Sequence, residues 1–234
     1  MVVLDLFSGI GGFSLGLERA GMRTAAFCEI DPKARLVLRK HWPDVPIFED
    51  VAALTAADMP EKIDVICGGF PCQDISLAGK GAGLAGERSG LWFQFHRLIS
   101  EIRPSWVIIE NVSALRSRGL DVILGGLAAL GYDAEWHCIP AAAVGAPHRR
   151  DRVWIIAYPQ RSGFRPEEPR HGTLRRVGGE FQPFPWDRGW ESALREFRGM
   201  DDGLSYGVDR VDTLRNAVVP QIPEIIGQAI MSCN

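Results

Sequence analysis

The segment "VVLDLFSGIGGFSLGLERAG", residues 2–21, joins a short apolar run to a glycine-rich turn and then to a helix-like pattern. Residues 2–7 have the length and composition of a buried strand, and residues 11–21 have helical spacing that closes on Gly21. Glycines between a strand and a helix let a ligand approach the backbone, and the helix N-terminus favours polar or anionic groups. The segment therefore predicts the first β-α unit of an α/β fold, with a ligand site at the turn.

The same alternation continues as far as Tyr158. The patterns predict further strands at 24–30, 62–69, 105–112, 133–139 and 152–158, and helices at 31–43, 90–104 and 119–132. Repeated β-α-β units with apolar strands are typical of a mostly parallel sheet flanked by helices. After Tyr158, prolines, glycines and arginines replace the periodic pattern, and a last helix is expected at 221–230.

Composition places the chain among ordinary globular proteins. It has 234 residues, of which 46% are hydrophobic and 24% are charged. The five cysteines are odd in number and form no CxxC pair, so neither a disulfide framework nor a structural zinc site is expected. Because the first residues lack a signal-peptide pattern and no apolar run has membrane length, we expect a soluble, cytoplasmic protein.

The charge is small overall but unevenly distributed. The net charge is −3, whereas residues 145–188 carry nine arginines and five acidic residues, a local net of +4. Arginine makes forked contacts to phosphate and guanine, which favours a nucleic-acid partner for this block. On charge alone, a solvated basic surface explains the block equally well.

Two acidic residues stand where a nucleotide would need them. Glu29 lies twenty residues after Gly9, at the end of the second predicted strand, where an acid accepts hydrogen bonds from ribose hydroxyls. Asp50 follows the third strand-like segment and could receive an adenine amino group. This pattern predicts a cofactor that contains adenosine, without choosing between NAD and S-adenosylmethionine.

The segment "VICGGFPCQDIS", residues 65–76, places Cys72 directly after Pro71 at the end of a predicted strand. Such a position faces the ligand crevice of an α/β sheet, and the proline limits where the thiol can point. Cys28 and Cys67 are instead interpreted as buried small hydrophobic residues. The glycine-rich residues 77–90 that follow are typical of a loop that closes over a substrate.

Two further clusters are expected at the same edge of the sheet. Glu110 and Asn111 end the strand "SWVIIENV", and Arg150 and Arg152 share one side of the extended segment "PHRRDRVW". A thiol, an acid and two arginines could thus converge beside the cofactor pocket. Each has an ordinary alternative reading, Glu110 as a salt-bridge partner and the arginines as surface charge.

Five segments carry a family resemblance: "DLFSGIGGFSLGLERAG", "GGFPCQDIS", "ENV", "HRRDRVWII" and "NAVVP". In this order they resemble the DNA cytosine-5 methyltransferases, and the chain looks like a short prokaryotic or phage-like member. The resemblance covers residues 2–157 and roughly 205–230. It implies a Rossmann-like, S-adenosylmethionine-dependent methyltransferase fold, with a catalytic and cofactor-binding domain at 1–158. A small irregular target-recognition region at 159–204 and a C-terminal segment at 205–234 that returns to the catalytic domain would complete it.

The resemblance also implies a covalent mechanism on a cytosine flipped out of the duplex. Cys72 would attack C6, Glu110 would hold or protonate N3, and Asn111 would support the loop. Arg152, with Arg150, would fix the base O2 and a nearby phosphate. After methyl transfer to C5, a base, expected to be water, would remove the C5 proton and the thiol would leave by elimination.

The remaining expected site residues fall into two sets. The cofactor-binding set is Phe7, Gly9, Ile10, Gly12, Glu29, Ile30, Asp50, Val51, Gly69, Pro71, Leu91, Asn216 and Val218. The DNA-binding set is Gln73, Ser76, Arg88, Arg149, Arg161 and Arg165. The expected ligands are S-adenosylmethionine and double-stranded DNA, and no metal is expected. The protein is expected to be a monomer, and a cognate restriction endonuclease, if present, would act separately.

The chain departs from the family pattern at three places. His148 stands where glutamine is usual, Arg215 stands where glycine precedes Asn216, and residues 194–216 replace the usual arginine- and leucine-rich motif. These departures are compatible with an alternative function, that of a homologue that binds DNA or cofactor without catalysis. An RNA cytosine-5 methyltransferase is a second alternative, because the catalytic half does not distinguish a DNA substrate from an RNA substrate. If the protein were a nicotinamide-dependent oxidoreductase, the Pro-Cys loop would have no explanation.

Overall fold

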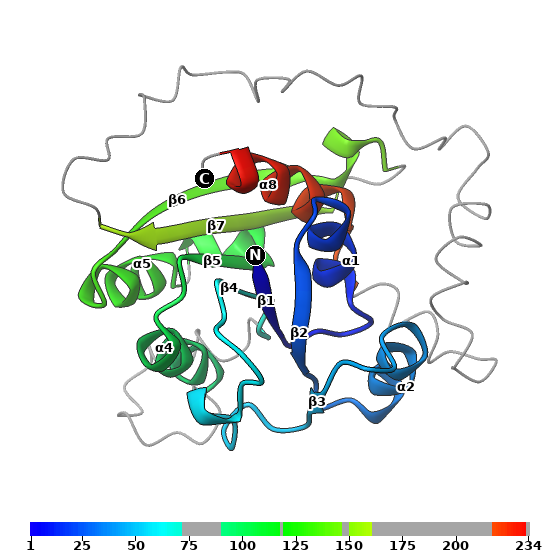
Figure 1. The fold of residues 1–234 in the computed structure, drawn as a ribbon. Helices are drawn as coiled ribbons and strands as arrows, with labels where there is room; N and C mark the ends of the chain where they lie inside the picture. Colours follow the sequence, from blue (N-terminus) through cyan, green and yellow to red (C-terminus); the bar gives the residue numbers. More distant parts are fainter. Residues whose placement is uncertain (72–89, 118, 147–149, 161–216, 233–234) are drawn as a thin grey trace.

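The computed structural model describes residues 1–71, 90–117, 119–146, 150–160 and 217–232, and within them a seven-stranded sheet forms the centre of the fold (Figure 1). The strand order is β3-β2-β1-β4-β5-β7-β6. The strands are β1 (Val2–Leu6), β2 (Arg23–Cys28), β3 (Ile47–Phe48), β4 (Val65–Gly68), β5 (Trp106–Val112), β6 (Tyr132–Pro140) and β7 (Asp151–Pro159).

Five strands are parallel and follow from the apolar runs in the sequence. β1 pairs in parallel with β2 and β4, β2 pairs with β3, and β4 pairs with β5. The order reverses between β1 and β4, because the chain leaves β1 toward β2 on one side and returns to β4 on the other. Such a reversal opens a crevice at the carboxyl ends of the strands, where α/β proteins bind ligands.

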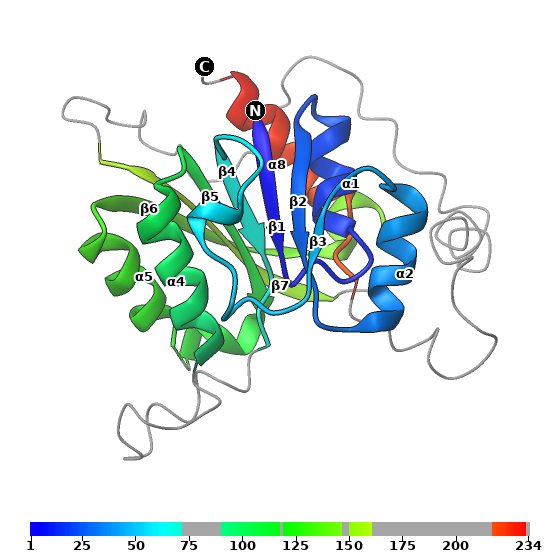
Figure 2. The same ribbon diagram turned by 60° about the horizontal axis from the view of Figure 1, so that its bottom comes forward.

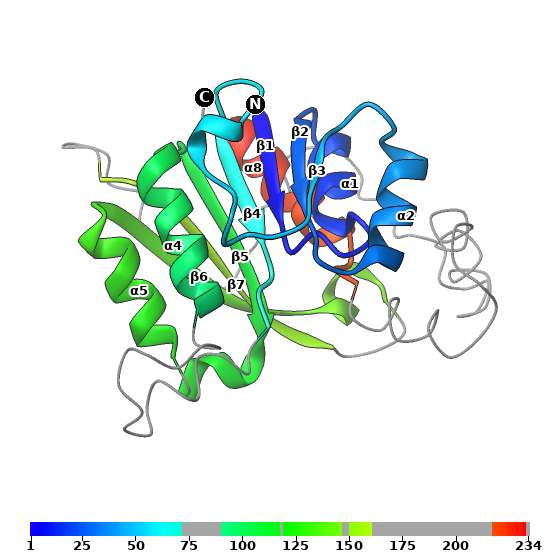
Figure 3. The ribbon, with the colours of Figure 1, turned by 90° about the horizontal axis from the view of Figure 1, so that it is seen from below.

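Helices cover both faces of the sheet, as the sequence predicts (Figures 2 and 3). On one face α1 (Gly12–Arg19) and α8 (Gln221–Ser232) pack on the strands through side chains such as Phe13, Leu17, Ile222 and Ile226. On the other face α4 (Gly90–Ile102) and α5 (Leu120–Ala129) bury residues such as Phe95 and Leu127. α2 (Pro32–His41) follows β2, and short 3-10 helices lie at Ala56–Asp58, Ser113–Ser117 and Ala141–Val144. No helix in these described ranges is long and apolar enough to span a membrane.

The last two strands differ from the parallel majority. β7 pairs antiparallel with both β5 and β6. Between β6 and β7 the described residues contain the short 3-10 helix Ala141–Val144 and no crossover helix. Antiparallel neighbours can be joined without such a helix, whereas parallel neighbours need a long connection. The predicted mostly parallel sheet is confirmed, and its antiparallel part is confined to the β5-β7-β6 end.

The C-terminal helix returns to the first helix of the chain. α8 packs alongside α1, and Val218, just before α8, lies over the start of α1. A Cβ atom on Gly12 would lie 2.6 Å from the carbonyl oxygen of Val218, so only glycine permits this approach. Residues 217–232 thereby join residues 1–20 next to the crevice. The domain boundaries proposed from the sequence remain predictions, because residues 161–216 lie outside the described part.

Candidate active site and cofactor pocket

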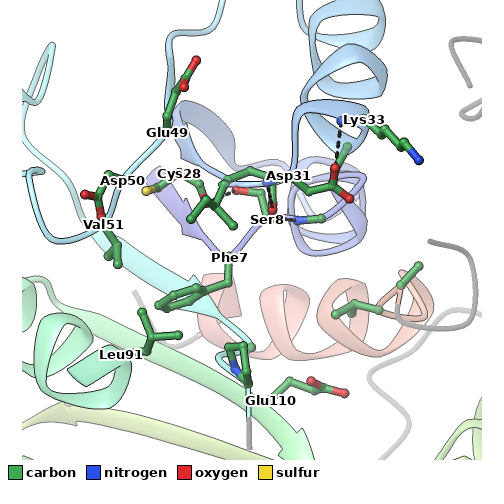
Figure 4. A pocket seen from close by; sticks show the side chains of 18 residues that line it. Phe7, Ser8, Cys28, Asp31, Lys33, Glu49, Asp50, Val51, Leu91 and Glu110 are labelled. Atoms are coloured by element: carbon green, nitrogen blue, oxygen red, sulfur yellow. Dashed lines mark hydrogen bonds between the residues drawn. The ribbon is translucent and has the colours of Figure 1, made fainter. Parts of the chain in front are cut away.

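A pocket of about 500 Å³ opens at the carboxyl edge of the parallel strands (Figure 4). This volume is within the range of small-molecule and cofactor sites. The predicted cofactor residues that line it are Phe7, Gly9, Glu29, Ile30, Asp50, Val51, Gly69, Pro71, Leu91 and Val218. Sequence reasoning missed Ser8, Cys28, Asp31, Lys33, Ala34, Glu49 and Ala217, which also line it and most of which are sequence neighbours of predicted residues.

Two predicted cofactor residues lie away from the lining. Ile10 is buried in a small apolar cluster with Ala34 and Val37, and Gly12 packs under Val218. Ile10 belongs to the turn beside the pocket wall and Gly12 to the start of α1, so neither is part of the wall itself. Asn216, the last residue of the predicted set, lies outside the described residues.

The glycine turn is tied to the end of β2 by Glu29. The N–H of Gly9 donates to Oε2 of Glu29 at 2.6 Å, and the N–H of Asp31 donates to Oε1 at 2.8 Å. Each carboxylate oxygen keeps a further lone pair, so Glu29 can still accept hydrogen bonds from a ligand. Phe7 turns the chain into this loop with a positive φ of 53°, a conformation that costs a residue with a side chain some strain.

Apolar and acidic side chains line different parts of the pocket. Phe7 packs against Phe70 and Phe95, with ring centroids 6.4 and 6.3 Å apart. In the view of Figure 4, Phe7 and Leu91 lie between the acidic rim of Glu49 and Asp50 and the carboxylate of Glu110. The pocket thus offers an apolar surface with carboxylates at its two ends.

Glu110 reaches the pocket from the end of β5 and is held by β7. Its Oε1 atom lies 2.8 Å from Nε of Arg152. Residue 112 pairs with Arg152 across the antiparallel strands, so Glu110 and Arg152 are diagonal neighbours on one face. Oε2 of Glu110 also lies 2.8 Å from where a Cβ on Gly69 would stand, so a side chain there would displace the carboxylate.

The electrostatics of Glu110 are a balance of burial against positive charge. Burial raises the pKa of its carboxyl group, while attraction to Arg152 and Arg150 and the Arg152 hydrogen bond oppose the rise; the net pKa lies above the ordinary value. For Arg150, burial and the nearby Arg152 lower the pKa, and Glu110 opposes this. Arg150 adopts a φ of +26°, an uncommon value for a non-glycine residue.

Asn111 connects this acid to the Pro-Cys loop. The residue is 3% exposed, and Nδ2 donates to the carbonyl oxygen of Phe70 at 3.0 Å. The backbone of the "GGFPC" segment is therefore fixed two residues before Cys72, and Pro71 is exposed at the pocket. Cys28 and Cys67 are buried, as predicted, and burial raises the pKa of each thiol, that of Cys28 to about 12.

Several predicted residues lie outside the described part of the chain. They are the predicted nucleophile Cys72, the departures His148 and Arg215, and the predicted DNA-binding set Gln73, Ser76, Arg88, Arg149, Arg161 and Arg165. Their roles stay predictions.

Asp5 lies beneath the glycine turn, and sequence reasoning missed it, although an acid inside the apolar run "VVLDLF" is a visible signal. The side chain is fully buried. Oδ2 accepts hydrogen bonds from the hydroxyl of Ser14 at 2.8 Å and from its N–H at 3.3 Å. Burial, with a smaller contribution from Glu29, raises its pKa to about 8, against the opposing hydrogen bonds of Ser14.

We expect Asp5 to make the stability of the protein depend on pH. Between its pKa of 3.8 in the unfolded chain and about 8 in the folded protein, only the folded state keeps the proton. The free energy of unfolding should therefore fall as pH rises, by up to about 1.4 kcal/mol per pH unit from this group. Urea unfolding of the wild type and Asp5→Asn from pH 5 to pH 8 measures the difference, and parallel curves for the two proteins would contradict the prediction.

The fold and the pocket together define a class of protein, the Rossmann-like α/β proteins that bind a ligand at the carboxyl edge of the sheet. A DNMT2 mutant from Spodoptera frugiperda has this fold, with a TM-score of 0.62 over 77% of this chain and 56% of that chain, at 20% sequence identity.

The sequence comparison then gives the family. The sequence model for C-5 cytosine-specific DNA methylases matches residues 1–177, and the chain belongs to this family, as its motifs predict. It is 40% identical over 165 residues to the type II methyltransferase M2.BsuMI of Bacillus subtilis, covering 67% of this chain and 42% of that protein. It is 33% identical over 190 residues to the type II methyltransferase M.AquIA of Picosynechococcus, covering 73% of this chain and 77% of that protein. The chain thus spans less than half the length of M2.BsuMI.

Proposed function

We propose that the protein transfers a methyl group from S-adenosylmethionine to C5 of a cytosine in duplex DNA. The observation that carries this proposal is the position of Glu110, which is ion-paired with Arg152 at 2.8 Å in the wall of the pocket. A buried acid with a raised pKa, beside two arginines and the Pro-Cys loop, suits a base that must be held and polarised.

The other end of the pocket fits the adenosine part of the cofactor. Glu29 and Asp50 stand at the ends of adjacent strands, where they can accept hydrogen bonds from ribose hydroxyls and the adenine amino group. Phe7, Val51 and Leu91 supply an apolar surface for the adenine ring. When bound, the cofactor supplies the methyl group.

The chain's own residues would then prepare the cytosine. Cytosine C5 is a poor nucleophile until the Cys72 thiolate adds to C6, which makes the ring an enamine. Glu110 would hold a proton at N3, and Arg152 with Arg150 would fix O2 and a nearby phosphate. Asn111 would keep the loop of Cys72 in place through the Phe70 carbonyl. After methylation a base removes the C5 proton and Cys72 is released.

The remaining parts of the proposal concern the partners. The target atom cannot be reached inside a duplex, so the cytosine would be flipped out of the stack. Residues 159–204 would read the target sequence, and the protein would act as a monomer in the cytoplasm of a prokaryotic cell or a phage-infected host. The names of the type II relatives support an association with a separate restriction endonuclease.

Methyl transfer from labelled S-adenosylmethionine tests the proposal directly. Purified protein is incubated with duplex DNA of mixed sequence and, separately, with tRNA, and the products are digested to nucleosides. The expected product is 5-methyl-2′-deoxycytidine from DNA alone. Label in tRNA would instead assign an RNA methyltransferase. Cofactor binding with no product on either substrate would assign a homologue that has lost catalysis.

A further inference from the structure

One wall of the cofactor pocket is a short irregular segment, residues 29–31, between β2 and α2. Ile30 is 77% exposed, so its own burial does not hold this part of the wall in place. A binding site needs supporting groups that fix the backbone of its contact residues, because small displacements weaken directional contacts. The segment must therefore be held from its other side.

Arg35 reaches that side from the first turns of α2. One of its terminal nitrogens, Nη1, donates hydrogen bonds to the backbone carbonyls of Ile30 at 2.7 Å and Glu29 at 3.1 Å. The other, Nη2, lies 3.2 Å from Oε1 of Glu49, a pocket residue that follows β3. One guanidinium group thus connects the wall segments that follow two neighbouring strands.

The local sequence explains why Arg35 points this way. Asp31 caps α2, its Oδ1 accepting the N–H of Lys33 at 2.9 Å, and Pro32 begins the helix. Long side chains on a helix lean toward its N-terminus, over the preceding turn. Arg35 lies one turn after the cap, so its side chain folds back over the segment 29–31.

Stability alone gives little reason for an arginine at this position. Arg35 is 9% exposed, and its Nε atom is buried without a hydrogen-bond partner among the described residues. Burial of a charge costs free energy that an apolar side chain of similar size would not incur. An apolar residue, however, could not hold two carbonyl groups and a carboxylate in a fixed arrangement.

We propose that Arg35 is a positioning residue for the cofactor, holding the 29–31 segment and Glu49 in the arrangement that binds adenosine. The proposal rests on the proposed function, since it names S-adenosylmethionine as the ligand of this pocket. Arg35 itself would touch neither cofactor nor DNA. It acts through the backbone of Glu29 and Ile30.

The test compares Arg35→Met and Arg35→Lys with Arg39→Met, a matched control on the exposed side of the same helix. Calorimetry with S-adenosylhomocysteine should show a dissociation constant raised about tenfold or more in Arg35→Met, from the loss of charged hydrogen bonds. Arg35→Lys keeps one cationic donor group, so its dissociation constant should lie between those of Arg35→Met and Arg39→Met. In steady-state assays the KM for S-adenosylmethionine should rise in parallel, while kcat and the KM for DNA stay within about twofold, since the cytosine-binding groups are unchanged.

A second measurement does not depend on the ligand. Hydrogen exchange of the folded protein should become faster at residues 28–33 in Arg35→Met and remain unchanged there in Arg39→Met. Unaltered affinity and unaltered exchange in Arg35→Met would overturn the positioning role, as would a loss of stability with no selective effect on the cofactor. If the wild type bound no S-adenosylhomocysteine, the proposed function would fail, and the cofactor role of Arg35 with it. The exchange data would then still decide whether Arg35 holds the segment.

Discussion

Replacement of Glu110 by glutamine is expected to lower kcat for DNA methylation by about 10²- to 10⁴-fold, the usual contribution of a positioned acid or base. Glutamine has the same shape and can still accept the hydrogen bond from Arg152, which lies 2.8 Å from Glu110. Its amide N–H can donate a hydrogen bond to N3 of the base but cannot transfer a proton to it. Burial raises the pKa of Glu110 above its ordinary value, and glutamine has no titratable proton, so the substitution should affect the chemical step.

Single-turnover assays with excess enzyme measure this step apart from product release. Glu135→Gln is a suitable control, because Glu135 lies on the edge strand β6, is exposed on the surface and bonds to the hydroxyl of Tyr158 at 3.0 Å. The dissociation constant for the cofactor should change far less than the rate. A single-turnover rate for Glu110→Gln within about threefold of the wild type would show that the carboxyl group is not the acid, since general acid–base groups contribute far more.

Replacement of Cys72 by alanine is expected to have the largest effect of any single substitution, a fall in kcat on the order of 10⁴-fold or more. Without the thiolate, no bond forms at C6 and C5 stays a poor nucleophile. Covalent trapping provides the measurement. DNA that carries 5-fluorocytosine lacks the proton that must leave C5, so the wild-type protein should remain attached to it when S-adenosylmethionine is present.

The trapped complex is detected as a band that survives denaturing electrophoresis. Cys72→Ala should give no such band, whereas Cys138→Ala, which removes an exposed thiol on β6, should give the wild-type amount. A band with Cys72→Ala would show that a residue other than Cys72 is the nucleophile. No band with the wild type, together with normal cofactor binding, would indicate a homologue that has lost catalysis.

Glu110 and Cys72 can both be identified from the sequence, but the sequence does not predict the contacts around them. The Pro-Cys pair and the "ENV" segment are recognisable within a few residues, because each depends on local order along the chain. The ion pair between Glu110 and Arg152 depends instead on β7 running antiparallel to β5. Apolar periodicity identifies a strand without giving its direction, so the pair could be expected only as a convergence at one sheet edge.

The supporting residues were the least visible in the sequence. Asp5 reads as an acid in an apolar strand, and only the fold places it against Ser14 under the glycine turn. Arg35 reads as one of several basic residues of an amphipathic helix. Its contacts are to backbone carbonyls and to Glu49, and backbone carbonyls carry no sequence signal at all.

By itself, the sequence determined the order of strands and helices and the family motifs. It also determined the glycine turn and the position of Glu29, whose separation from Gly9 along the chain is typical of nucleotide-binding sites. These features are encoded by side-chain periodicity and by short motifs, which act over a few residues. The tertiary structure alone decided the direction of β7, the pairing of Glu110 with Arg152, and the hold of Arg35 on the pocket wall. These contacts join residues that are distant along the chain or hidden in the backbone, so they exist only once the sheet and its helices have packed together.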